Sequence, residues 1–139
     1  MITIEEAVLA YAAAWNENDD QMQRQLLEKC WTDDGVVISN HDYLMGREQL
    51  FENIRQFRHR CPHDRAVLTS GIDQHHNWFR FTAIVIRPDG SAYSEALDIG
   101  EVGPDGRICR IITFFGPLPP VLAKGQMQSF RKGEIHENH

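Results

Sequence analysis

The stretch DIGEVGPDGRICRIITFFG, residues 98–116, decides the fold. It places a turn signal, Gly103-Pro104-Asp105-Gly106, between two runs rich in apolar residues. Proline fixes its own φ and glycine accepts a positive φ, so Pro-Asp-Gly favours a tight turn. We therefore predict two adjacent strands, of which the second, 108–115, is almost wholly apolar and buried on both faces. The first strand carries one acid, Asp98, which must lie at an exposed edge or in a cavity that shifts its pKa.

The C-terminal half around this hairpin consists of strands. Residues 66–72, 78–86, 92–102 and 107–115 are predicted strands because they are rich in β-branched and aromatic residues and are separated by turn signals. Consecutive strands joined by short turns form an antiparallel meander. The proline-rich segment 116–120 ends the sheet, since proline cannot donate to its hydrogen bonds. We expect a domain of residues 1–120 and a C-terminal extension, 121–139, whose Phe130 belongs to the one segment suited to a protein partner.

The N-terminal half is helical. Thr3-Ile4-Glu5-Glu6 has the form of a capping box, and three segments, about 4–16, 20–30 and 47–58, repeat apolar residues every three or four positions. Residues 36–38 form a short strand after a turn at 33–35, and residues 39–46 are expected to be irregular. The sequence thus predicts an α+β domain with three helices packed on one face of a strongly curved, mostly antiparallel sheet.

The composition argues against several classes of protein and of binding site. The net charge of −6 argues against a nucleic-acid-binding module, and the first residues lack the basic and apolar runs of a signal peptide or membrane span. The three cysteines are scattered, which favours free thiols in a reducing cytoplasm. A metal site needs ligands that converge on one point, but Pro62 interrupts the helix that would align His59 with His63, and His75-His76 has the character of a hairpin turn, so we expect no metal.

The order of the motifs resembles the SnoaL-like branch of the nuclear transport factor 2-like (cystatin-like α+β) superfamily over residues 3–119. The motifs that carry the resemblance are Tyr11-Ala-Ala-Ala-Trp15-Asn16, Asp19, Leu26-Leu27, Trp31-Thr-Asp-Asp34, Gly46-Arg-Glu-Gln-Leu50, His75-His76, Arg80-Phe81, Asp98, Asp105-Gly-Arg107 and Phe114-Phe-Gly116. The resemblance implies a cone-shaped sheet with an internal apolar pocket, and a homodimer through the outer sheet face. It implies no cofactor. The superfamily contains isomerases, polyketide cyclases, dehydratases, epoxide hydrolases and binding proteins, so the fold alone does not choose the function.

A more distant resemblance to ketosteroid isomerases suggests catalytic residues. Tyr11 falls where that family has its oxyanion-hole tyrosine, and Asp98 where it has a protonated acid. The general base of that family falls on Ser39, a hydroxyl that is not a base near neutral pH. His41 or Asp42 could replace the base because both lie in the loop that would border the pocket.

Each candidate has a structural alternative. Asp98 could pair with Arg110 or cap a turn, Trp15 could be plain core packing, and the 41–42 segment could be a solvated loop. Alternation along 78–86 predicts that Phe79, Phe81 and Ala83 face inward. Besides Asp98 and Tyr11, the predicted ligand contacts are Trp15, Trp31, Asn40, His41, Asp42, Phe51, Ile54, Phe79, Phe81 and Phe115.

The sequence therefore favours a protein that binds a hydrophobic small molecule. If it is an enzyme, the expected reaction is proton transfer on a hydrophobic carbonyl compound, as in isomerisation, cyclisation or dehydration. The alternatives are a ligand carrier that performs no reaction and a protein-interaction module of the same fold.

Overall fold

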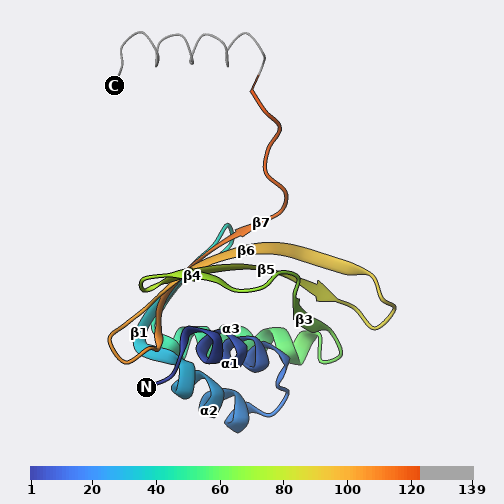
Figure 1. Ribbon diagram of the computed structural model, residues 1–139. Helices are drawn as coiled ribbons and strands as arrows, with labels where there is room; N and C mark the ends of the chain where they lie inside the picture. The colour runs from blue at the N-terminus through green and yellow to red at the C-terminus, as the bar shows by residue number, and fades with distance from the viewer. Residues whose placement is uncertain (123–139) are drawn as a thin grey trace, which may run out of the picture.

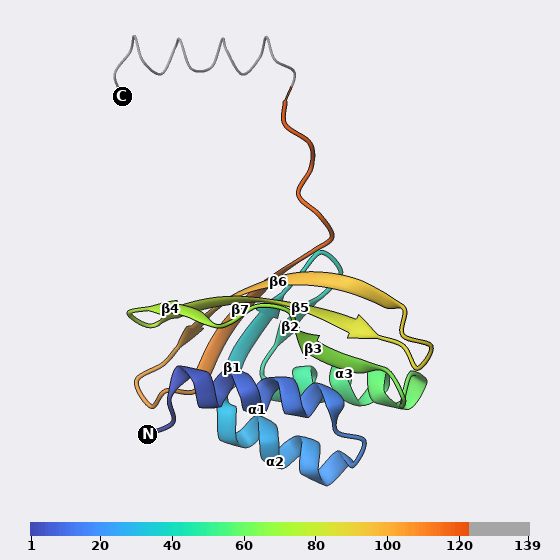
Figure 2. The same ribbon diagram turned by 45° about the vertical axis from the view of Figure 1, so that its right-hand side comes forward.

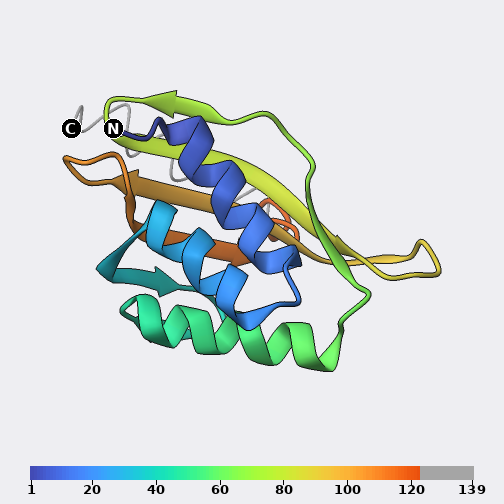
Figure 3. The ribbon, with the colours of Figure 1, turned by 90° about the horizontal axis from the view of Figure 1, so that it is seen from below.

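The computed structural model describes residues 1–122 and has three helices on one face of a curled, open sheet (Figure 1). The helices α1 and α3 lie next to the sheet, and α2 packs against both of them on the far side (Figures 1 and 3). Among these residues, no helix has the length and the apolar character needed to cross a membrane. The elements in chain order are α1 (Ile4–Asn16), α2 (Asp20–Cys30), β1 (Trp31–Ile38), β2 (Tyr43–Met45), α3 (Arg47–Arg60), β3 (Arg65–Leu68), β4 (Asp73–His75), β5 (Trp78–Ile86), β6 (Ala92–Val102) and β7 (Ile108–Phe115).

The helix starts follow from local chemistry. Thr3 forms the predicted capping box: its hydroxyl accepts from the Glu6 N–H, and the Glu6 carboxylate accepts from the Thr3 N–H. Asp19 caps α2 in the same way by accepting from the Met22 N–H at 2.9 Å. Each cap satisfies N–H groups that the first helical turn leaves without partners.

The sheet has the order β2-β1-β7-β6-β5-β3, with β4 added on β5 (Figure 2). All pairs are antiparallel except β1 with β7, which is parallel. The predicted α+β class and mostly antiparallel sheet are therefore confirmed. The sheet curls around α1 and α3 without closing, so the expected cone is open along one side.

Three local predictions were wrong. Residues 33–35 form part of β1, where the register shifts between Trp31 and Val36, instead of a turn. The segment 39–46, expected to be irregular, contains the three-residue strand β2, and the turn expected between the predicted strands 66–72 and 78–86 contains the three-residue strand β4. Strand β7 is buried on its inner face only, because Arg110 and Phe114 point away from the helices and are exposed.

The core lies between the helices and the concave face of the sheet. Its largest fully buried side chains include Trp31, Leu27, Leu50 and Ile54. Phe79 and Phe81 point into it from β5, as predicted, with their rings stacked 6.2 Å apart. The part of the chain predicted as an extension is described only to residue 122, and Phe130 lies outside the described residues.

Candidate functional site

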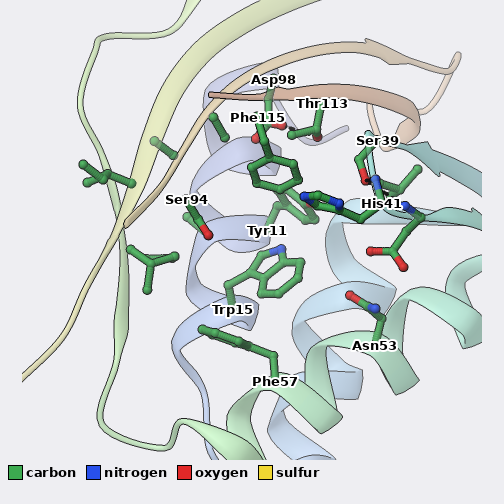
Figure 4. A pocket seen from close by; sticks show the side chains of 18 of the residues that line it. Tyr11, Trp15, Ser39, His41, Asn53, Phe57, Ser94, Asp98, Thr113 and Phe115 are labelled. Carbon is green, nitrogen blue, oxygen red and sulfur yellow. Dashed lines mark hydrogen bonds between the residues drawn. The ribbon is translucent and has the colours of Figure 1, made fainter. Parts of the chain in front are cut away.

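A cavity of about 290 Å³ lies between the concave face of the sheet, the C-terminal half of α1, the inner side of α3 and the 39–42 loop (Figure 4). Most of its wall is apolar, and the side chains that form it include Trp15, Val37, Phe57, Phe81 and Phe115. Small-molecule sites in proteins are commonly concave, mostly apolar and equipped with a few polar groups. This cavity has that character.

Asp98 is the acid of the inner wall. It lies in the middle of β6, opposite Phe81 on β5 and Thr113 on β7, and is 8% exposed. The Thr113 hydroxyl donates a hydrogen bond to its carboxylate. Burial raises the pKa of Asp98 to about 6, because removal from water penalises the charged form more than one hydrogen bond stabilises it. The group can therefore change protonation state near neutral pH.

The alternative in which Asp98 pairs with Arg110 does not hold. Arg110 points to the outer face and makes a 2.8 Å salt bridge with Glu101. No basic side chain among residues 1–122 lies within salt-bridge distance of Asp98. The Asp98 carboxylate therefore accepts a hydrogen bond from Thr113 and lines the cavity.

Tyr11 lies under Asp98 in the same cavity (Figure 4). Its ring stacks on Trp31 at 5.2 Å and meets the edge of Trp15 at 6.4 Å. Burial raises the pKa of Tyr11 well above its ordinary value, and the nearby charge of Asp98 raises it further. Tyr11 thus keeps its proton at neutral pH and can donate a hydrogen bond into the cavity.

Ser39 organises the loop at the rim of the cavity. Its hydroxyl accepts from the N–H groups of His41 and Asp42 at 3.1 and 3.0 Å, and its own N–H donates to the Asp42 carbonyl at 2.9 Å. A hydroxyl that already accepts two hydrogen bonds holds a turn. The residue at the position of the isomerase base is thus a scaffold for its two neighbours.

The loop places His41 and Asp42 on the cavity rim. Both side chains are exposed and line the opening. The His41 ring stacks on Phe115 with centroids 5.3 Å apart and planes inclined by 27°. His41 therefore lies over the end of β7, at the rim of the cavity.

The structure brings seven of the predicted site residues to the cavity and leaves five elsewhere. Those that line it are Tyr11, Trp15, His41, Asp42, Phe81, Asp98 and Phe115. Those outside the lining are Trp31, Asn40, Phe51, Ile54 and Phe79.

Each of the five has another partner. Trp31 lies behind Tyr11, fully buried, and Ile54 is fully buried on α3, away from the cavity. Phe51 faces α2, where the Arg24 guanidinium lies 3.9 Å from its ring centroid. Phe79 covers the bare backbone of Gly100, since a Cβ there would stand 2.1 Å from its ring. The Asn40 side chain accepts from the Phe115 N–H at 2.8 Å.

Sequence reasoning missed four polar residues of the lining: Asn53, Arg60, Ser94 and Thr113. Asn53 and Arg60 could have been grouped with Phe57, because the three form an i, i+4, i+7 stripe along α3, although the stripe alone does not say that it faces the cavity. Ser94 could not, because it enters the lining through an irregularity between β5 and β6, where it adopts φ 54°. Irregularities of this kind redirect side chains at the rims of sites.

Metal-binding groups do not converge in the described part of the chain. No set of three or more His, Cys, Asp or Glu side chains there is arranged around one point. His75 and His76 lie 3.1 Å apart, Nδ1 to Nδ1, on the exposed end of β4, away from the cavity.

No protein-family model and no curated protein matches the sequence. Solved structures do. A candidate isomerase of the SnoaL-like family from Agrobacterium tumefaciens is 28% identical, with 80% of this chain and 95% of that one covered and a TM-score of 0.74.

Two further structures are more distant in sequence. A nuclear transport factor 2-like protein of unknown function from Cytophaga hutchinsonii is 14% identical over 84% of this chain and 93% of that one, with a TM-score of 0.64. A candidate SnoaL-like polyketide cyclase from a Jannaschia species is 13% identical over 80% and 85%, with a TM-score of 0.59. The chain therefore has the nuclear transport factor 2-like, cystatin-like fold, and its likeness to the Agrobacterium protein supports the SnoaL-like branch of that superfamily.

Proposed function

We propose that the protein binds a hydrophobic carbonyl compound in this cavity and transfers a proton on it without a cofactor. The observation that carries the proposal is Asp98, a buried carboxyl group with a raised pKa and one hydrogen-bond partner, facing an apolar cavity. Perturbed acids in apolar clefts are typical of sites that move protons. The structural likeness to a candidate isomerase and a candidate polyketide cyclase agrees with small-molecule chemistry.

The proposed step uses Asp98 as the base and then as the acid. The ionised carboxylate takes a proton from the carbon next to the carbonyl, and the electron pair of that C–H bond moves onto the carbonyl oxygen to give an enolate. Tyr11, which keeps its proton, donates a hydrogen bond to that oxygen. Protonated Asp98 then returns the proton to the same carbon or to a conjugated one. Donors aimed at a developing oxyanion in a dry site are a major source of rate acceleration.

The site also explains why the rate would depend on pH. Asp98 must be ionised to take the proton, and its pKa is about 6. Activity should therefore rise as the pH increases through about 6 and level off above it.

Hydrogen–deuterium exchange at the carbon next to the carbonyl tests this proposal without knowledge of the natural substrate. Small ketones such as 2-tetralone are incubated in deuterium oxide with the protein, and proton loss is followed by NMR. We expect catalysed exchange with the wild type, a loss of about 100-fold or more in Asp98→Asn, and about 10- to 100-fold in Tyr11→Phe. Asp33→Asn, which removes an exposed strand carboxylate, should exchange like the wild type. Exchange by Asp98→Asn at the wild-type rate would show that Asp98 is not the base that removes the proton.

A second candidate function is a carrier in which the ligand binds and no reaction follows. It is favoured by Ser39, whose hydroxyl holds the loop where the isomerase resemblance would place the base. This candidate predicts saturable binding of ketones with no deuterium incorporation, so the same experiment separates the two functions.

We also propose that a second copy of the chain covers the outer face of the sheet. Tyr43, Met45 and Phe114 are 63%, 60% and 55% exposed and lie on the strands β2 and β7, which are both neighbours of β1. Exposed apolar side chains gathered on one sheet face are typical of protein interfaces.

A further inference from the structure

The cavity has one charged end that the proton-transfer proposal does not use. Arg60, the last residue of α3, lines the cavity and is exposed at its opening. Phe57 and Asn53 line it from the same side of α3, about one and two turns earlier, respectively. Arg60 therefore belongs to the wall of the site.

Arg60 has no partner of its own in the described part of the chain. Of the ten arginines there, eight donate hydrogen bonds to other groups, and Arg60 and Arg65 are the two that do not. Arg65 lies outside the cavity lining. A cation in the last turn of a helix interacts favourably with the helix dipole, but this applies to any side of the helix and does not explain why Arg60 faces the cavity.

The local charge at this end is opposite to that of the whole protein. The segment 58–65 has three arginines, two histidines and one acid, although the net charge of the chain is −6. Arg58 is buried and uses its donors on the Asn18 side chain and on the carbonyls of Pro62 and Asp64. The acid, Asp64, accepts from the Tyr93 hydroxyl. Arg60 is thus left to face the opening within a basic surrounding.

The two acidic groups of the cavity come from parts of the chain other than the C-terminal end of α3. Asp42 precedes β2 and is close in sequence to the N-terminus of α3, whereas Arg60 is at the C-terminus of that 14-residue helix, about 20 Å away along its axis. Asp98 lies inside, on the sheet. A ligand would meet a positive charge at one end of the opening and the proton-transfer groups further in.

The volume limits what can fit. A cavity of about 290 Å³ is at the small end of the range usual for ligand sites, so it suits the apolar body of a compact molecule. One end of such a molecule can extend to the opening.

We infer that the ligand is a small keto acid whose carboxylate binds Arg60 at the opening while its apolar, carbonyl-bearing body enters toward Asp98. The inference rests on the proposed function for the position of the carbonyl group. Arginine suits this role because its planar guanidinium can donate two parallel hydrogen bonds to a carboxylate. Arg60 would thus select the acid over its neutral ester.

The test compares benzoylpropionate with its methyl ester, two probes that differ in charge and share the ketone and the ring. Affinities are measured by isothermal titration calorimetry for the wild type, Arg60→Gln, Arg60→Lys and Arg65→Gln, with circular dichroism to establish folding. We expect the wild type to bind the acid about three- to tenfold more tightly than the ester. Arg60→Gln should remove this preference, Arg60→Lys should restore part of it, and Arg65→Gln should keep it. High salt should reduce the preference, because the ion pair is exposed.

The outcomes separate this inference from the proposed function. Equal binding of acid and ester by the wild type, or an equal loss in Arg65→Gln, would overturn the inference while leaving the role of Asp98 intact. Binding of neither probe would also overturn it. A preference that depends on Arg60, together with no effect of Asp98→Asn on ketone exchange, would support the inference and count against the proposed chemistry.

Discussion

Thr113 on β7 stands directly opposite Asp98 on β6, and its hydroxyl donates to the Asp98 carboxylate. The two effects on the Asp98 pKa have opposite signs: burial raises it and the hydrogen bond lowers it, with burial the larger. The pair thus sets the pH at which the acid changes charge. Because both residues lie in the middle of the sheet, their geometry is fixed by strand pairing instead of a flexible loop.

Replacement of Asp98 by Asn should stabilise the protein at high pH. The unfolded carboxyl group loses its proton near its ordinary value of 3.8 and the folded one near 6. Between these values the folded state binds more protons, so this group makes stability fall as the pH rises, and the cost is fully present above about 6. Asp98→Asn should therefore raise the free energy of unfolding by about 1–3 kcal/mol at about pH 8 and change it little at about pH 4.

Urea unfolding at the two pH values measures this difference. Asp33→Asn serves as the control because Asp33 is an exposed strand residue. A loss of stability in Asp98→Asn at about pH 8 would mean that the charged carboxylate holds the fold together, contrary to our interpretation.

Replacement of Thr113 by Val should raise the pKa of Asp98 above its wild-type value of about 6. Valine keeps the shape of threonine but cannot donate the hydrogen bond that favours the ionised form. Carbon-13 NMR of the aspartate carboxyl signals over a pH series reports the midpoint. Thr82→Val is the matched control, because the Thr82 hydroxyl bonds to Thr69 and not to Asp98. A midpoint that stays the same or falls would contradict the role of Thr113.

Removal of the Ser39 hydroxyl should loosen the loop that carries His41. In Ser39→Ala the N–H groups of His41 and Asp42 lose their acceptor, so their amide hydrogens should exchange faster with solvent. The free energy of unfolding should change by less than about 1 kcal/mol, because the loop is exposed. Hydrogen exchange followed by NMR provides the measurement. Ser39→Thr keeps the hydroxyl and should retain protection; equal protection in Ser39→Ala would show that the turn does not depend on it.

A methyl group at Gly100 should destabilise the sheet. Its Cβ would stand 2.1 Å from Cζ of Phe79, so the ring must leave its buried position. We expect Gly100→Ala to lower the free energy of unfolding by about 1–3 kcal/mol. Gly71→Ala is the control because no atom lies within 4 Å of its Cβ position, and its effect should stay within about 0.5 kcal/mol. Similar unfolding curves for the two variants would show that Phe79 repacks without cost.

An acidic residue at position 114 should prevent the proposed dimer. Phe114 is 55% exposed on the outer sheet face, where a second copy would desolvate an introduced carboxylate. Light scattering after size-exclusion chromatography should give a dimer for the wild type and a monomer for Phe114→Asp. Leu9→Asp changes a residue that is 52% exposed on α1 and should leave the mass unchanged. A monomeric wild type would refute the dimer.

The features that sequence reasoning predicted well depend on a few neighbouring residues. The capping box at Thr3 and the turn at 103–106 are each determined within four residues, and Gly106 adopts the expected positive φ of 85°. The inward direction of Phe79 and Phe81 follows from strand alternation.

The features that it missed depend on distant contacts. The apolar stripe of α3 correctly makes Phe51 and Ile54 buried, but it does not say whether a side chain faces the cavity or a neighbouring helix. The motif around Trp31 predicts a site residue, yet Trp31 stacks on the side of Tyr11 that faces away from the cavity lining. The three-residue strands β2 and β4 are too short to show periodicity and form because an existing strand offers hydrogen bonds.

The parallel pairing of β1 with β7 has a consequence for synthesis. Val37 pairs with Ile111 although more than half of the described chain lies between them. A nascent chain that has produced α1, α2 and β1 cannot complete the described sheet until β7 has been synthesised, and until then apolar side chains of the core stay exposed to solvent. Pairings of such long range make folding slow and expose intermediates to aggregation. Strand β7, which carries the hydrogen-bond donor of Asp98, is thus also the strand that joins β1 to the rest of the sheet.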